Sequence, residues 1–206
     1  MRLFPLAALA AVLTATLASA QSAAPPEAPP VTDAKNYDPQ TINALPIGRL
    51  ARKMLYATAS PRQRGELRMP SGPGPHPLAV IWHGGCWSGM GSTANVAELA
   101  RYLQSNGVAV LTLSYRELGS GGTPAEVPER YALVDPLVNM PRIKRLLVVD
   151  GALPDPDPAI IAGLRAQGIK VEVIRVDQDQ HFNMLVPGTK DFAAIAPALL
   201  DITRGR

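Results

Sequence analysis

Short apolar runs and helically spaced apolar residues alternate along the middle of the chain. Residues 78–83 (LAVIWH) and 108–113 (VAVLTL) are continuous apolar runs of strand length, which predicts two buried strands. Between them, apolar residues recur every three or four positions over residues 95–105, and Asn106-Gly107 follows as a helix stop. The order strand, helix, strand is typical of a parallel pair joined by a right-handed crossover.

The same order returns in the second half of the chain, which ends in an amphipathic helix. The predicted strand, helix, strand and final helix are residues 145–150, 159–166, 170–176 and 191–202. Pro197 is expected to kink the last helix. Residues 64–69 alternate enough to predict an edge strand. The pattern therefore predicts the α/β class, with a mostly parallel sheet flanked by helices in three layers.

The first 20 residues have the sequence pattern of a targeting segment rather than of a folded domain. Residues 1–20 carry one basic residue and an apolar stretch shorter than a membrane span, and they end in Ala18-Ser19-Ala20, a small-x-small cleavage pattern. This arrangement predicts a signal peptide that is removed on export, which leaves a secreted or periplasmic protein with no membrane attachment. Residues 21–45 follow as a Pro- and Ala-rich linker and lead-in, and residues 46–206 as one domain.

Composition and charge narrow the possible functions. Hydrophobic residues make up 47% of the chain and charged residues 18%, a balance that is typical of a globular protein. The formal net charge of +3 falls by one unit when Arg2 leaves with the signal, and the remaining charges are scattered, so we expect no nucleic-acid partner. The single cysteine, Cys86, excludes an intramolecular disulfide. Because the three histidines lack the close ligand spacing of a zinc site, we expect no metal and no cofactor.

A glycine-containing loop follows the first of the two buried strands. Residues 83–87 read His-Gly-Gly-Cys-Trp. Two glycines let the backbone turn sharply beside a ligand and leave N–H groups free to face developing negative charge. A glycine pair alone also fits a simple strand end, so the neighbouring motifs decide its meaning.

This loop resembles the His-Gly-Gly loop of the α/β-hydrolases, in particular the branch that contains kynurenine formamidases and lipase- or esterase-like enzymes. Further motifs match that family in the expected order: Tyr115-Arg116, 128–132 (PERYA), Asp135-Pro136 and His181-Phe182. The resemblance implies an α/β-hydrolase fold and a serine esterase or amidase that acts on a small carboxylic ester, amide or formamide. It also implies that the backbone of Gly84, Gly85 and Cys86 binds the oxyanion.

The resemblance further assigns an acid and a base. Asp155 lies in the loop after the strand at 145–150, where the family places its catalytic carboxylate; Asp157 is the alternative, because the sequence PDPDP leaves the register open. His181 lies in the loop after the strand at 170–176, where the family places its catalytic histidine. An imidazole titrates near neutral pH and accepts a hydroxyl proton when a carboxylate holds its tautomer.

The serine nucleophile of this family is missing from the sequence. It belongs on a strand-to-helix turn of the pattern Gly-x-Ser-x-Gly, and no such pentapeptide occurs in the chain. Ser120 comes nearest, but Leu118 stands at the first glycine position. Only residues 117–127 separate the flanking motifs, where the family has a helix, the nucleophile strand and another helix. We infer a truncated α/β-hydrolase fold with an internal deletion of about 60 to 90 residues.

Three interpretations stay open from the sequence alone. The chain is a hydrolase-type protein with impaired catalysis, an active esterase or amidase with Ser120 or Cys86 as substitute nucleophile, or a ligand-binding remnant with a cleft around Trp87 and His181. The deletion also has a structural consequence, because the lost strand is the central one of the family's sheet. The flanking strands must either pair with each other or leave apolar edges exposed.

Overall fold

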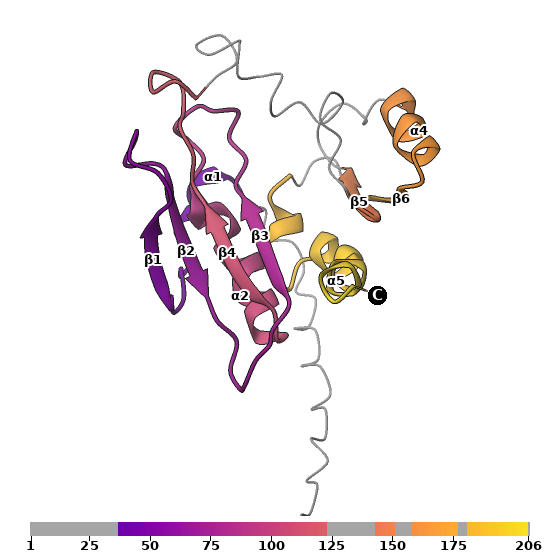
Figure 1. The fold of residues 1–206 in the computed structure, drawn as a ribbon, viewed down its shortest axis with the longest axis horizontal. Helices are drawn as coiled ribbons and strands as arrows, with labels where there is room; N and C mark the ends of the chain where they lie inside the picture. Colours follow the sequence, from indigo (N-terminus) through magenta and orange to yellow (C-terminus); the bar gives the residue numbers. More distant parts are fainter. Residues whose placement is uncertain (1–36, 123–142, 151–157, 177–180, 206) are drawn as a thin grey trace, which may run out of the picture.

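The computed structural model describes residues 37–122, 143–150, 158–176 and 181–205 (Figure 1). Several expectations from the sequence lie outside these residues: the signal peptide at 1–20, the Pro- and Ala-rich tether, the motifs at 128–132 and 135–136, and both Asp155 and Asp157. Within the described ranges, no helix is long and apolar enough to cross a membrane.

Four strands form the first sheet, in the order β1-β2-β4-β3. They are β1 (Arg52–Leu55), β2 (Arg64–Arg68), β3 (Leu78–Trp82) and β4 (Ala109–Leu113). β2 runs antiparallel to both β1 and β4, whereas β3 and β4 are parallel. Valine, isoleucine and aromatic side chains favour the pleated backbone of β3 and β4. Because β3 and β4 are parallel, their carboxyl ends lie at the same edge of the sheet, toward the top of Figure 1.

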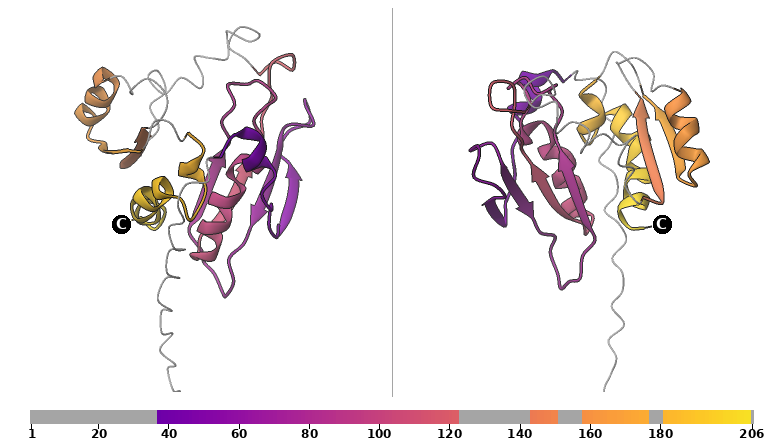
Figure 2. Two further views of the ribbon diagram at one scale, coloured as in Figure 1. Left: turned by 180° about the vertical axis from the view of Figure 1, so that it is seen from behind. Right: turned by 45° about the horizontal axis from the view of Figure 1, so that its top comes forward.

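One face of the first sheet packs against helix α2 (Ala97–Ser105), which follows the 3-10 helix η1 (Thr93–Val96). The apolar residues of α2 recur every three or four positions and therefore share one side of the helix. The core between the helix and the sheet consists of Ala100, Leu103, Val108 and Val110. Figure 2 (left) shows α2 in front of the sheet, on the side that faces away from the reader in Figure 1.

The rest of the described chain forms a smaller unit and a final helix. β5 (Arg145–Asp150) and β6 (Lys170–Arg175) are a parallel pair, and α4 (Pro158–Ala166) lies between them in sequence. Their core consists of Ile161, Leu164, Ile169 and Val171. η2 (Asn183–Leu185) and α5 (Lys190–Thr203) follow, and α5 continues as one helix through Pro197.

Helix α5 contacts both units. Leu199 and Leu200 pack against the core beneath α2. Phe192 is only 2% exposed, and its ring meets that of Tyr102 on α2 edge to face, with centroids 4.8 Å apart. Because α5 also contacts β5, it joins the smaller unit to the first sheet.

The lead-in contributes to the packed domain before residue 46. Helix α1 (Pro39–Asn43) begins at Asp38, whose side chain accepts a hydrogen bond from the Thr41 N–H (2.7 Å). Ile42 of this helix is fully buried, and α1 contacts η1. The folded region therefore includes part of the segment that the sequence assigns to the lead-in.

The predicted elements are present, but two of them have different neighbours from those expected. The strand predicted at 64–69 is present, but its predicted edge position is wrong, because β2 lies between β1 and β4. The strand predicted at 78–83 is also present, but its predicted burial is wrong, since β3 is the edge strand of its sheet. Its Leu78, Val80 and Trp82 are 59%, 40% and 60% exposed. Apolar runs predict strands well, whereas burial depends on which distant segments lie beside them.

The structure establishes α/β content with a mixed sheet and flanking helices, which is coarser than the expected mostly parallel sheet in three layers. Among the described strands, β3–β4 and β5–β6 are parallel, and β1–β2 and β2–β4 are antiparallel. β3 and β5 belong to separate sheets. Within the described residues, β3 ends its sheet with an exposed apolar edge.

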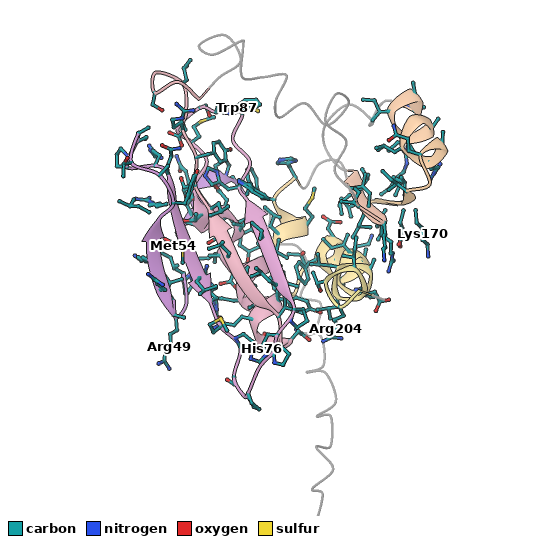
Figure 3. All side chains as sticks on the ribbon, viewed as in Figure 1. Arg49, Met54, His76, Trp87, Lys170 and Arg204 are labelled. Carbon is teal, nitrogen blue, oxygen red and sulfur yellow. The ribbon has the colours of Figure 1, made fainter. Side chains whose placement is uncertain are left out.

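The face of the first sheet opposite α2 is also apolar. Val80 lies beside Leu111 and Trp82 beside Leu113 in the β3–β4 register. Successive side chains alternate between faces, so these four point away from Val110 and the α2 core. Figure 3 looks onto this face, and no described helix lies over it.

Candidate functional site

The segment from His83 to Gly91, called the glycine loop below, follows β3 directly. It lies at the carboxyl ends of the parallel strands β3 and β4, where Figure 3 shows Trp87. Ligands of open α/β sheets commonly bind at this edge, because the loops there leave the sheet on one side. The loop's position agrees with the one expected from the sequence.

His83 anchors the start of the glycine loop. The residue is only 4% exposed, and its Nδ1 lies 2.7 Å from the Gly84 carbonyl oxygen. A carbonyl oxygen only accepts hydrogen bonds, so Nδ1 carries the proton and donates. The neutral ring then has its lone pair on Nε2, which is buried and has no partner in the described part of the chain. His83 is therefore a structural anchor with one unsatisfied acceptor.

Tyr115, two residues beyond β4, holds the same loop from the neighbouring strand. Its ring stacks on that of His83, with centroids 4.5 Å apart and planes 17° from parallel. Its hydroxyl donates to the His83 carbonyl (2.8 Å) and also lies 3.3 Å from the Gly84 carbonyl. Burial raises the pKa of Tyr115, and nearby Glu117 and Cys86 raise it further. The phenol therefore stays protonated at neutral pH and remains a donor.

A tight turn follows at the centre of the glycine loop. The Gly85 carbonyl accepts hydrogen bonds from the Ser88 N–H (2.8 Å) and the Ser88 hydroxyl (2.6 Å). Cys86 and Trp87 occupy its middle with φ angles of 49° and 57°, in the left-handed region. Each such non-glycine residue costs roughly 1–2 kcal/mol, and strain of this kind is concentrated at functional sites.

The two ends of the glycine loop also pack against each other. A Cβ on Gly85 would lie 2.8 Å from the Gly91 Cα, and a Cβ on Gly91 would overlap the Gly84 carbonyl oxygen. Glycine at both positions therefore lets the two backbone segments touch. This contact closes the loop over the His83 ring.

The hydrogen bonds of the loop engage three successive carbonyl groups, which constrains the orientation of the peptide N–H groups that follow them. In a trans peptide the N–H points opposite to the carbonyl of the preceding residue. The carbonyls of His83, Gly84 and Gly85 are all occupied within the protein. The N–H groups of Gly84, Gly85 and Cys86 therefore point away from those contacts, and no hydrogen bond joins them to another described residue. Gly84 and Cys86 are exposed and Gly85 is partly buried, so the loop lies at the surface, where unpaired N–H groups can meet an anion.

Ser120 and His181 are not brought together by a hydrogen bond in the described ranges. The Ser120 hydroxyl donates to the Glu117 carbonyl (2.8 Å) and accepts from the Glu117 N–H (2.9 Å), so it closes its own turn. His181 is exposed, and its ring contacts only Phe182 among the described rings, with centroids 5.0 Å apart. Cys86 has an exposed, unpaired thiol on the glycine loop. Asp155 and Asp157 lie outside the described residues.

The described cavities lie away from the glycine loop. One of about 460 Å³ is lined by α2 residues with Arg49 and Met69, and one of about 430 Å³ lies between β5 and α5. Neither is lined by Trp87 or His181, which the ligand-binding interpretation places around a cleft. In the ranges that the structure describes, no three His, Cys, Asp or Glu side chains gather as a metal site.

Sequence reasoning missed the roles of Tyr115 and Gly91. Tyr115 was a family motif residue without an assigned role, and its contact with His83 depends on β4 lying beside β3. Gly91 ends a segment with four glycines, at 84, 85, 89 and 91. That glycine density is the signal in the sequence for a loop that packs backbone on backbone.

We expect His83 to make stability depend on pH. Burial lowers its pKa, although the hydrogen bond to Gly84 and the charge of Glu117 offset part of the effect and Arg62 adds to it. Below about pH 6.5 the His83 imidazole is therefore protonated in the unfolded chain but stays neutral in the folded chain. Neutral His83 therefore contributes fully to the free energy of unfolding above about pH 6.5. This contribution is lost as the pH falls toward the lowered pKa, by at most about 1.4 kcal/mol per pH unit.

Urea unfolding at pH 7.5, 6.5 and 5.5 measures this slope. His83→Gln should make the dependence of the unfolding free energy on pH shallower. Equal slopes in the wild type and His83→Gln would contradict the assignment.

Comparison with known proteins gives no relative: no protein-family model matches the chain, and neither the curated proteins nor the solved structures contain a match.

Proposed function

We propose that the chain is a secreted protein of the α/β-hydrolase type, related to serine esterases and amidases, that binds a carboxylate on its glycine loop and has lost acyl transfer. The observation that carries this proposal is the set of N–H groups on Gly84, Gly85 and Cys86, which have no hydrogen-bond partner among the described residues. Backbone donors fixed by surrounding bonds stabilise a negative oxygen without first having to reorganise. The ligand class is a small acyl group, as the ester, amide or free acid.

The strand arrangement supports a truncated version of the hydrolase sheet. β3 ends the first sheet with an exposed apolar edge, and β5–β6 forms a second parallel pair. This is the arrangement expected when a central parallel strand and its helices are missing. We interpret the two sheets as parts of one mostly parallel, three-layered fold that is interrupted near residues 117–127.

The surroundings of the candidate nucleophiles support the proposed loss of acyl transfer. Covalent catalysis needs a hydroxyl or thiol within hydrogen-bond reach of a base that a third group orients. The Ser120 hydroxyl is instead engaged twice by the Glu117 backbone. No described hydrogen bond connects His181 with Ser120 or Cys86. The secreted location rests on the predicted signal peptide at 1–20.

We expect the purified chain to bind acetate and formate without hydrolysing esters. In ¹⁵N-¹H spectra, the amide signals of Gly84, Gly85 and Cys86 should shift with added acetate, because their N–H groups contact the carboxylate. A serine-reactive fluorophosphonate should leave the chain unlabelled, and short acyl esters and formamides should show no turnover. An intact serine esterase, treated in parallel, verifies both reagents. Stoichiometric labelling of Ser120 or another serine would contradict the loss of catalysis, and unmoved loop amides would contradict the binding.

One observation favours a second candidate, an esterase or amidase with Cys86 as nucleophile. Its thiol is exposed and lies on the same loop as the unpaired N–H groups. In this alternative, the Cys86 sulfur attacks the acyl carbon and forms a thioester, while the alcohol or amine leaves with a proton. Water then hydrolyses the thioester, which releases the carboxylic acid and regenerates the thiol. Turnover that disappears in Cys86→Ala and persists in Ser120→Ala would establish this alternative.

A further inference from the structure

We propose that Tyr115 is a positioning residue that aims the N–H groups of Gly84 and Gly85 at the bound carboxylate. This inference rests on the proposed function, because it concerns the same loop. Tyr115 itself lies on the neighbouring strand end and has no direct part in the hydrogen bonds offered to the ligand. It acts through the peptide groups whose carbonyls its hydroxyl contacts.

The argument begins with the peptide between His83 and Gly84. Its carbonyl oxygen accepts from the Tyr115 hydroxyl at 2.8 Å, and no other described donor bonds to it. Holding this oxygen toward Tyr115 fixes the peptide plane. The Gly84 N–H, on the opposite side of the same plane, is therefore directed away from Tyr115, toward the exposed side of the loop.

The next peptide is held by two groups. The Gly84 carbonyl accepts from His83 Nδ1 at 2.7 Å and lies 3.3 Å from the Tyr115 hydroxyl. Its fixed orientation directs the Gly85 N–H to the same side as the Gly84 N–H. Glycine has no side chain to restrict rotation of these peptides, so without the hydroxyl the first of them is free to turn.

The ring of Tyr115 provides a separate contribution that phenylalanine preserves. It stacks on the buried His83 ring at 4.5 Å and keeps that side chain in place. Tyr115→Phe therefore removes the donor that orients the peptides while it retains the stacked pair. The structure also offers a matched control: the Tyr56 hydroxyl donates to the Ser114 carbonyl at 2.7 Å, outside the glycine loop.

The test compares wild type, Tyr115→Phe and Tyr56→Phe by ¹⁵N-¹H spectroscopy. Without ligand, Tyr115→Phe should shift or broaden the amide signals of Gly84 and Gly85, and Tyr56→Phe should leave them in place. In an acetate titration followed on the Cys86 amide, Tyr115→Phe should bind about five- to tenfold more weakly, the effect of losing one hydrogen bond. Tyr56→Phe should bind like the wild type, although both variants lose a hydroxyl-to-carbonyl bond of similar length.

The two readouts separate this inference from the proposed function. Unchanged Gly84 and Gly85 signals in ligand-free Tyr115→Phe would overturn the positioning role whether or not acetate binds. Equal acetate affinity in the wild type and Tyr115→Phe would also overturn it. If acetate moves no loop amide in the wild type, the proposed function fails, and the inference fails with it because no ligand is positioned. Equal weakening in both variants would reduce Tyr115 to a general structural role and overturn the inference.

Discussion

Gly91→Ala is expected to open the glycine loop and to lower the free energy of unfolding by about 1–3 kcal/mol, the range for forcing extra atoms into a closed contact. The added Cβ would overlap the Gly84 carbonyl oxygen and lie 2.8 Å from His83 Nδ1. The backbone must then move, and the hydrogen bond from His83 Nδ1 to the Gly84 carbonyl oxygen must break. Urea unfolding followed by circular dichroism measures the loss, and the Gly84 and Gly85 amide signals report the opening.

Gly84→Ala is the matched control for this prediction. A Cβ on Gly84 meets no atom within 4 Å, and its φ angle is outside the left-handed region. The substitution should therefore change stability by less than about 1 kcal/mol. Similar losses in Gly84→Ala and Gly91→Ala would show that the close contact between the loop ends does not form in solution.

The second large effect is expected at Phe192, on the helix that joins the two units. Phe192→Ala should cost about 3–5 kcal/mol, because it leaves a cavity beside Tyr102 and removes the edge-to-face ring contact at 4.8 Å. α5 should then detach from α2. Thermal and urea unfolding measure the loss of stability, and hydrogen exchange of the α5 amides measures the detachment.

Phe182→Ala provides the comparison for Phe192→Ala. Phe182 precedes η2 and is only partly buried, so its removal should cost clearly less than the loss of Phe192. A loss at Phe192 no greater than that at Phe182 would mean that α5 does not depend on this contact.

Local patterns in the sequence predict the elements of the fold but not their pairing. The apolar run at 78–83 identifies β3, and the helical spacing before Asn106-Gly107 identifies α2. Nothing in residues 64–69 reveals that β2 lies between β1 and β4, because pairing depends on segments elsewhere in the chain. For the same reason the apolar side chains of β3 predict burial, although the observed sheet ends at that strand.

The candidate site was predictable only in part. The glycine pair at 84 and 85 predicts a sharp turn with accessible N–H groups, and the structure has that turn. The hydrogen bond from Tyr115 to the His83 carbonyl was not predictable, because Tyr115 reaches the loop only when β3 and β4 are neighbours. The proposed roles of His181 and Asp155 stay predictions. The first has no described hydrogen bond that tests it, and the second lies outside the described residues.

The edge strand β3 is expected to promote association between molecules at high concentration. Among the described strands, β3 has no partner on its far side, so alternate backbone groups of this strand are unpaired there. They accompany the exposed side chains of Leu78, Val80 and Trp82. Strands of this kind template pairing between molecules, and natural proteins commonly protect them with a lysine or a proline. β3 has neither residue. Colloidal solubility, rather than unfolding, should therefore limit handling of the protein, and a lysine at Val80 is the simplest remedy.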